Sequence, residues 1–177
     1  MNRAQIVLAR FDLAEYRLCR GLNRAASQHV LRALFQAASR LGDGVFWYAM
    51  LAALPLAYGA RAIRPVVVMA VTGLVATALY KLIKHSLVRE RPFIRHAGIT
   101  LAMPPLDRYS FPSGHTLHAV CFSWQAIAHF PGLAWLLVPM ASLIATSRVV
   151  LGLHYPSDVL AGAVLGAVLA QFGLVFG

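Results

Sequence analysis

Long apolar segments, separated by short polar stretches, make up most of the chain after residue 44. We place five such segments at about 45–60, 65–83, 115–130, 132–147 and 157–177. A helix needs about 20 apolar residues to cross the roughly 30 Å hydrocarbon core of a bilayer, so flanking residues must complete the shorter crossings. We therefore predict an all-α fold, a polytopic transmembrane helical bundle with about five spanning helices. Gly162 and Gly166 are spaced for close helix contact in the last segment, which we assign to packing inside the bundle.

The first 44 residues show a different pattern, in which arginine recurs at every seventh position. These arginines fall close to one helical face: Arg3, Arg10, Arg17 and Arg24. Apolar side chains occupy another face: Ile6, Leu13 and Tyr16. The pattern suits amphipathic helices in the head-group layer of a membrane, and equally a helix that packs on the protein's own surface. Gly42-Asp43-Gly44 predicts a turn, so we divide the chain into an amphipathic region, 1–44, and a transmembrane bundle, 45–177.

Composition supports a membrane protein, since 59% of the residues are hydrophobic and only 12% are charged. An average soluble domain has about 25% charged residues. The formal net charge is +10, which in a soluble protein would suggest nucleic-acid binding. Here the basic residues lie at the ends of membrane segments, so we expect anionic lipid head groups and phosphate as partners, and no nucleic acid. Cys19 and Cys121 show no metal or redox spacing.

Three short polar blocks interrupt the apolar pattern, and each falls where a membrane segment starts or ends. The blocks lie at 84–92, 112–115 and 147–158. If the first segment enters the membrane from one face, the second and fourth return to that face, and the third and fifth leave from it. Counting passes therefore places all three blocks on the same face. Ionisable groups are costly beside hydrocarbon, so this recurrence indicates either interfacial anchors or a shared site.

The cations of the three blocks suit a phosphate ligand. Lys84, Arg91 and Arg148 would each most often be an interfacial anchor, but together they can surround one phosphate. Arginine offers planar bidentate donors, and lysine adds a movable charge. Ser113 and Gly114 come just before a predicted helix, so their backbone N–H groups can bind an anion. We predict these five residues as the phosphate-binding set.

Two histidines and one carboxylate supply candidate catalytic groups. Asp158 lies four residues after His154 and can reach one nitrogen of its ring, which leaves the other nitrogen as a nucleophile. His115 begins a neighbouring helix, where it can protonate a leaving oxygen and then activate water. Taken alone, His154 and Asp158 would more often be an interface histidine and its cap. The convergence of the blocks favours catalysis.

At this point the residues resemble a known family. Lys84-x6-Arg91-Pro92, Pro112-Ser113-Gly114-His115 and Ser147-Arg148-x5-His154-x3-Asp158 look like the complete signature of the type 2 phosphatidic acid phosphatases. The resemblance implies a membrane-embedded helical bundle and a metal-independent phosphatase with no cofactor. It implies His154 as nucleophile, His115 as acid and base, and Asp158 as the group that orients His154. Many integral members have six crossings, whereas we predict five and an amphipathic start.

The remaining acids and histidines do not form a metal-binding pattern. Asp158 is better used on His154, which leaves Glu90 and Asp107 as the other acids near the predicted site. A two-metal phosphatase needs several clustered ligands, so we predict no metal. We assign structural or interface roles to the other histidines of the bundle: His85, His96, His118 and His129. His29 belongs to the amphipathic region, where we expect it to be solvated.

From a phosphate site at the membrane face, we expect the substrate to be a lipid phosphate or diphosphate whose tail stays in the bilayer. We favour undecaprenyl diphosphate by analogy with small bacterial members of the family, with phosphatidylglycerophosphate, phosphatidate and lipid A as alternatives. Fourteen Lys and Arg fall on the side of the polar blocks, and only Arg61 and Arg64 on the other. This asymmetry favours a cytoplasmic site, whereas an undecaprenyl substrate favours the outer face. We expect a bacterial inner membrane. A lipid-phosphate transporter and a structural membrane scaffold are the non-enzymatic alternatives.

Overall fold

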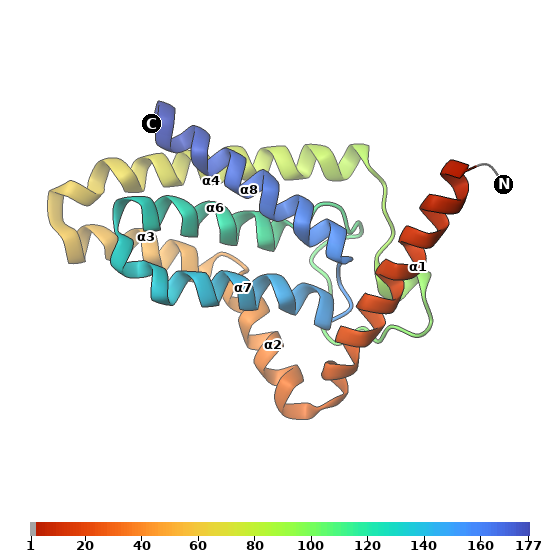
Figure 1. The fold of residues 1–177 in the computed structure, drawn as a ribbon. Coiled ribbons are helices and arrows are strands. Elements are labelled where there is room, and N and C mark those ends of the chain that lie inside the picture. Colours follow the sequence, from red (N-terminus) through yellow and green to blue (C-terminus); the bar gives the residue numbers. More distant parts are fainter. Residues whose placement is uncertain (1–2) are drawn as a thin grey trace.

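The fold is a set of helices, most of them joined by short connections, with a longer loop between α5 and α6 (Figure 1). A computed structural model describes residues 3–177, and it places side chains from Arg10 onward, so the side chains of Arg3 and Ile6 lie outside the described residues. The helices are α1 (Arg3–Asn23), α2 (His29–Leu41), α3 (Val45–Tyr58), α4 (Ile63–Ser86), α5 (Pro92–Arg95), α6 (Gly114–His129), α7 (Ala134–Val150) and α8 (Pro156–Phe176). Short 3-10 turns lie at η1 (Arg24–Ser27), η2 (Gly59–Ala62) and η3 (Pro131–Leu133). Residues 3–177 contain no strand, and the predicted all-α class is confirmed.

Helices α3, α4, α6, α7 and α8 form a lengthwise bundle, and α6 lies inside it (Figure 1). Helix α6 packs against α8, α7 and α4, and its Leu117, Ala119 and Cys121 have no exposed surface. Three stretches in the described part of the chain are long and apolar enough to span a membrane: Val45–Ser86, Pro131–Val150 and Pro156–Phe176. The first of them folds back at η2, so it contains both α3 and α4. The predicted bundle of five helices is thus confirmed.

The contact between α6 and α8 depends on glycine. A Cβ atom at Gly162 would lie 2.5 Å from the carbonyl oxygen of Ser113, and a Cβ at Gly166 would overlap the carbonyl oxygen of Leu117. Backbone atoms cannot yield as a flexible side chain can, so only glycine allows this approach. These two glycines therefore serve packing within the bundle, as the sequence predicts.

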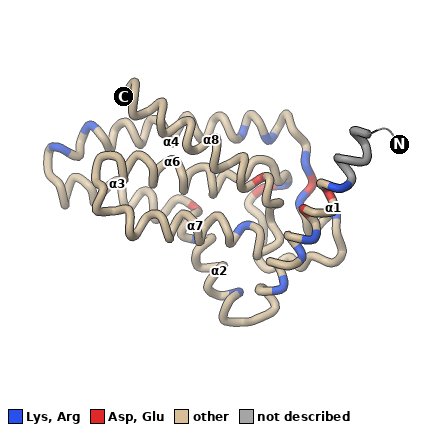
Figure 2. The backbone as a smooth tube through the Cα atoms, viewed as in Figure 1, with Lys and Arg blue, Asp and Glu red and all other residues tan. Residues whose placement is uncertain are grey.

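The outer surface of the bundle is apolar, and the charges gather at one end. Large aliphatic and aromatic side chains are more than half exposed on several helices, including Leu56, Leu74, Leu160 and Phe172. Such a surface fits contact with hydrocarbon rather than water. Figure 2 shows that most Lys and Arg lie at the end of the bundle where α1 and α2 are attached. Arg61 and Arg64 lie in and just after η2, at the opposite end, as the pass count predicts.

The second half of α1 packs on the protein through a polar face. Glu15, Cys19 and Asn23 are buried, while Arg10 and Arg17 point outward. The Asn23 amide donates to the carbonyl oxygens of Thr100 and Val150, and the Thr100 N–H donates back to Asn23 Oδ1. The alternative of a helix on the protein's own surface therefore holds for this half of α1. The amphipathic region is attached to the loop at 97–106 and to the end of α7.

Candidate active site

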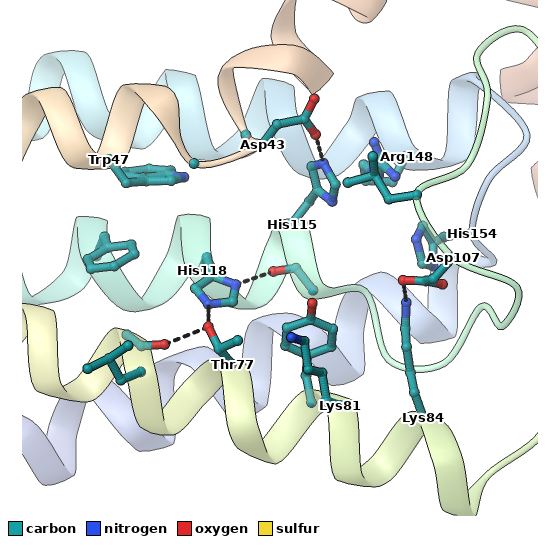
Figure 3. A pocket seen from close by; sticks show the side chains of 18 of the residues that line it. Asp43, Trp47, Thr77, Lys81, Lys84, Asp107, His115, His118, Arg148 and His154 are labelled. Carbon is teal, nitrogen blue, oxygen red and sulfur yellow. Dashed lines mark hydrogen bonds and ion pairs between the residues drawn. The ribbon is translucent and has the colours of Figure 1, made fainter.

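The three polar blocks meet at one end of the bundle, as counting passes predicts. They lie at the end of α4 and the chain after it, at the start of α6, and between the end of α7 and the start of α8. A cavity of about 850 Å³ opens there. Six of the predicted site residues line it: Lys84, Arg91, Gly114, His115, Arg148 and His154. Figure 3 shows Lys84, His115, Arg148 and His154 around a common space.

A carboxylate already lies among the cations. Asp107, from the loop between α5 and α6, accepts from Lys84 Nζ at 2.6 Å and from Arg91 Nη2 at 2.8 Å. Arg91 Nε also donates to the Asp107 carbonyl oxygen at 3.0 Å. Burial alone would raise the pKa of Asp107, but the hydrogen bonds and charges of Lys84 and Arg91 outweigh burial and lower it. Asp107 therefore stays ionised in this position.

Arg148, like Arg91, is a deeply buried cation of the site. It comes from the last turn of α7 and has 2% of its surface exposed. Its Nη1 donates to the hydroxyl of Ser39 in α2, and its Nε has no hydrogen-bond partner among the described residues. A buried guanidinium with a free N–H has unused capacity for an oxygen ligand. Arg148 is also one of the residues that line the cavity.

His154 lies in the connection between α7 and α8, and 1% of its surface is exposed. Its backbone N–H donates to the Arg148 carbonyl oxygen at 3.0 Å, and its Nε2 lies 3.3 Å from Arg91 Nη1. Burial, together with the charges of Arg148 and Arg91, holds the pKa of His154 well below its usual value. The imidazole is therefore neutral near pH 7, and one ring nitrogen keeps a free electron pair.

Asp158 lies behind His154, but its carboxylate is shared. Its Oδ2 is 3.7 Å from His154 Nδ1, an ion-pair separation rather than a hydrogen bond, and that nitrogen has no hydrogen-bond partner in the described part of the chain. The same Oδ2 accepts from the Tyr155 N–H at 2.8 Å, and Oδ1 accepts from Arg89 Nη1 at 2.6 Å. Asp158 is fully buried, so it contributes to the site through His154 and not by touching a ligand.

Arg89 is a site residue whose role the sequence does not reveal. It joins Asp158 to Glu15 of α1, with 2.6 Å from Nη2 to the Glu15 carboxylate. Its guanidinium also lies 4.1 Å from the centre of the Tyr155 ring. Glu15 in turn accepts from the Ser157 N–H at the start of α8. Helix α1 thereby supports the carboxylate behind His154.

His115 and Ser113 open α6 in different ways. Ser113 is fully buried and caps the helix, since its hydroxyl accepts from the Thr116 N–H, and it does not line the cavity. His115 does line the cavity, and its Nε2 lies 2.5 Å from Oδ1 of Asp43 in the turn between α2 and α3. Neither Asp43 nor Ser39 belongs to a motif, so the sequence predicts neither contact.

Two of the other histidines, His118 and His96, have structural contacts, whereas His85 lines the cavity. His118 Nδ1 lies 2.8 Å from the Gly114 carbonyl oxygen, and its Nε2 lies 3.0 Å from the Thr77 hydroxyl. His96 lies against Tyr16, with 4.5 Å between ring centres. Within residues 10–177, no group of three or more His, Cys, Asp and Glu could hold a metal ion.

The far part of the cavity is apolar and lies between α3, α4 and α6. Its lining includes Trp47, Leu51, Leu74 and Phe122. The rings of Trp47 and Phe122 stack with their centres 5.5 Å apart. Figure 3 shows Trp47 at a distance from Lys84 and Asp107 along the bundle. The cavity therefore combines a cationic end with an apolar extension.

Comparison with known proteins gives a family and two similar folds. A sequence model described as the PAP2 superfamily matches residues 61–176. The crystal structure of Aquifex aeolicus LpxE is similar with a TM-score of 0.78 and 26% identity, over 90% of this chain and 94% of that one. A transmembrane PAP2 type phosphatidylglycerolphosphate phosphatase from Bacillus subtilis has a TM-score of 0.69 and 24% identity, over 97% and 94% of the two chains.

Curated relatives match shorter regions. Undecaprenyl-diphosphatase BcrC of Bacillus subtilis is 33% identical over 99 residues, which cover 56% of this chain and 51% of the relative. An undecaprenyl-diphosphatase of Sulfolobus acidocaldarius is 30% identical over 130 residues, or 73% and 62%. Lipid A 1-phosphatase of Rhizobium johnstonii is 33% identical over 110 residues, or 55% and 45%. The chain thus spans about half to three-fifths of the length of these relatives. The similarity to a transmembrane phosphatase fold and the long apolar helices of this chain together indicate an integral membrane protein.

Proposed function

This chain belongs to the PAP2 superfamily, and from that membership we propose that it is a membrane-embedded lipid phosphatase working through a phosphohistidine. The observation that carries the proposal is the cavity in which Lys84, Arg91 and Arg148 meet His115 and His154. A cluster of cations binds phosphate, and a neutral imidazole beside it supplies a nucleophile.

In the first step, the Nε2 electron pair of His154 attacks phosphorus. The P–N bond forms as the bond from phosphorus to the leaving oxygen breaks, and His115 gives that oxygen a proton. Nε2 faces Arg91, at 3.3 Å from Nη1, so the nucleophile points into the cationic end. Lys84, Arg91 and Arg148 stabilise the negative charge on the equatorial oxygens during in-line transfer.

In the second step, water attacks the phosphohistidine. His115, now neutral, takes a proton from the water as its oxygen bonds to phosphorus, and the P–N bond breaks. Inorganic phosphate leaves, and His154 regains its electron pair. The buried Asp158 helps to hold the ring of His154 and offsets its positive charge while phosphorus is attached.

The substrate that we propose is a polyprenyl diphosphate, with undecaprenyl diphosphate first. The undecaprenyl-diphosphatases of Bacillus and Sulfolobus support this choice, and the apolar extension of the cavity suits a lipid chain. The connection between α4 and α6, residues 87–113, contains only the short helix α5, so it forms no folded cap for a large head group. A compact diphosphate therefore fits the cationic end.

Lipid A is the second candidate substrate. The Rhizobium relative is a lipid A 1-phosphatase, at an identity equal to that of BcrC. Phosphatidylglycerophosphate and phosphatidate remain as further members of the panel to be tested. We also propose a bacterial inner membrane as the location, since the chain has long apolar helices and several of its relatives are bacterial.

The test is release of inorganic phosphate by purified protein in detergent, from undecaprenyl diphosphate, lipid A, phosphatidylglycerophosphate and phosphatidate. We expect release from one lipid above the others, with and without EDTA, and inhibition by vanadate. His154→Ala should abolish release, whereas His129→Ala, at the opposite end of α6, should leave it intact. A wild-type protein that binds these lipids without releasing phosphate would identify a binding or transport protein instead. If neutral substitutions of Lys84, Arg91 and Arg148 change neither lipid binding nor phosphate release, the result would favour a structural membrane scaffold.

A further inference from the structure

A short turn brings one carboxylate into the cavity from the amphipathic region. Asp43 lies between α2 and α3, with a glycine on either side. A Cβ at Gly42 would lie 2.9 Å from Ile144 and 3.0 Å from the ring of His115, and Gly44 has φ of 116°, which favours glycine. A side chain at Gly42 would press on Ile144 and on the His115 ring, and one at Gly44 would strain the backbone, so these glycines favour the close approach. Asp43 is placed by that approach.

The carboxylate of Asp43 contacts the side chain of His115. Its Oδ1 lies 2.5 Å from His115 Nε2, and within the described residues it makes no other hydrogen bond or ion pair. Figure 3 shows Asp43 reaching the ring of His115 from the side of α2. The neighbouring Ser39 of α2 accepts from Arg148 in the same cavity. The amphipathic region thus contacts two groups of the site.

The contact determines which ring nitrogen of His115 can exchange a proton. A carboxylate only accepts hydrogen bonds, so the proton shared with Asp43 belongs to Nε2. His115 Nδ1 makes no hydrogen bond within residues 10–177 and is the nitrogen available to the cavity. A carboxylate on one nitrogen also stabilises the imidazolium, as in an Asp–His pair of a hydrolase triad.

We propose that Asp43 is a positioning residue for His115, holding its proton on Nε2 so that Nδ1 acts as acid and then as base. This inference rests on the proposed phosphatase function. In the first step, Nδ1–H of the imidazolium gives its proton to the leaving oxygen as the bond from phosphorus to that oxygen breaks. In the second step, Nδ1 takes a proton from water as water attacks the phosphohistidine. Asp43 keeps the Nε2 proton in both steps.

Asp43 lies outside the part of the chain that the family sequence model matches, residues 61–176. The phosphatase motifs quoted above contain one carboxylate, Asp158, which stands behind His154. A second carboxylate, behind the other histidine, gives each imidazole its own acidic partner. The amphipathic region then has a direct part in catalysis besides any contact with lipid.

The first test is Asp43→Asn, which removes the charge but keeps the size and a hydrogen-bond acceptor. We expect kcat to fall about 10- to 100-fold for an ester with a poor leaving group, such as phenyl phosphate. For 4-nitrophenyl phosphate, whose leaving group needs little protonation, we expect a loss of less than about threefold. Asp12→Asn, which removes an exposed carboxylate of α1, is the matched control and should change neither rate. Equal losses on the two esters would overturn the proposal.

A second test uses the active lipid of the panel and a double substitution. If Asp43 acts through His115, Asp43→Asn costs nothing further in a His115→Asn background. A turn that merely holds the fold would lower the rate in both backgrounds, and that result would contradict the proposal.

Ring-nitrogen NMR of labelled histidine decides the contact without any turnover. We expect His115 in the wild type to show the proton on Nε2, and Asp43→Asn to give mixed tautomers, with His115→Asn identifying the signals. Unchanged signals in Asp43→Asn would refute the pairing. If the wild type releases no phosphate from any lipid, the proposed function fails, while this measurement still tests the pair.

Discussion

The carboxylate of Asp107 lies 2.6 Å from the ammonium of Lys84, at the cationic end where a phosphate is proposed to bind. It accepts from Arg91 as well, at 2.8 Å. The Asp107 carboxylate therefore neutralises part of the positive charge of Lys84 and Arg91. A substrate phosphate that binds both cations has to displace this carboxylate. The Asp107 side chain is 39% exposed, so solvent screens the interaction and limits its strength.

Asp107→Asn should therefore strengthen anion binding. Without the internal carboxylate, vanadate or inorganic phosphate meets uncompensated cations, and we expect the inhibition constant to fall about two- to fivefold, or about 0.5 to 1 kcal/mol. Inhibition of lipid hydrolysis by vanadate at fixed ionic strength measures the change. An unchanged or weaker inhibition would mean that Asp107 holds the cations in place rather than competing for them.

The pH profile should reflect the lowered pKa of His154. Burial and the charges of Arg148 and Arg91 favour the neutral ring, so its electron pair stays available until the pH falls below about 6.5, the ordinary histidine value. We expect the acidic limb of kcat/KM below that pH. Lys84→Gln removes one of the cations that lower this pKa, so the limb should move to higher pH. A limb that moves to lower pH in this variant would contradict the argument.

Arg89→Ala should destabilise the protein, because it leaves Asp158 charged and buried with its main partner gone. Removing one member of a buried ion pair costs about 3 kcal/mol. Thermal unfolding in detergent measures the loss as a lower Tm. The control is Arg95→Ala, which breaks the 3.5 Å pair with Asp12, where both side chains are about half exposed. That change should cost less than about 1 kcal/mol.

Gly166→Ala should weaken the packing of α8 on α6. The added Cβ meets the Leu117 carbonyl oxygen, and backbone must shift to admit it, at a cost of about 1 to 3 kcal/mol. Gly21→Ala in α1 is the matched control, because nothing lies within 4 Å of its added Cβ. There alanine favours the helix by about 0.5 to 1 kcal/mol. We therefore expect Gly166→Ala to lower the Tm and Gly21→Ala to raise it. Similar shifts in the two variants would show that close packing of α8 on α6 is not the cause of the change.

Leu51→Trp should narrow the apolar extension of the cavity. We expect hydrolysis of a long-chain lipid phosphate to fall, while phenyl phosphate, which has no chain, is hydrolysed as before. Leu56→Trp, on the same helix but 88% exposed, should alter neither rate. Equal effects on both substrates would show that the lipid chain lies elsewhere. Comparison of Tm values excludes a general loss of folding.

The bundle and the place of the motifs can be predicted from sequence, because both follow from short-range patterns. Apolar runs indicate the crossings, and the parity of those crossings brings Lys84, His115 and His154 to one end. Ser113 shows what such reasoning leaves open. Its position before a helix is compatible with an anion ligand and with an N-cap, and the structure shows the cap, while the phosphate role stays a prediction.

The contacts that the amphipathic region makes with the site cannot be predicted from sequence in this way. Asp43 reaches His115 across 72 positions, and Glu15 reaches Arg89 across 74. Such pairings depend on how α1 and α2 are seated against the loops, and no spacing within the chain records this. Gly42 and Gly44 mark a turn in the sequence, but what the turn approaches is a tertiary property.

The glycine contact between α6 and α8 joins the two proposed reactive histidines mechanically. Gly162 and Gly166 leave no space between α6, which carries His115 in its first turn, and α8, which follows His154, so these two helices should move as a single rigid unit. The Ser113 N–H, which donates to the Asp158 carbonyl oxygen, ties their starting points together. The relative position of the two imidazoles should therefore be preserved when other helices of the bundle shift.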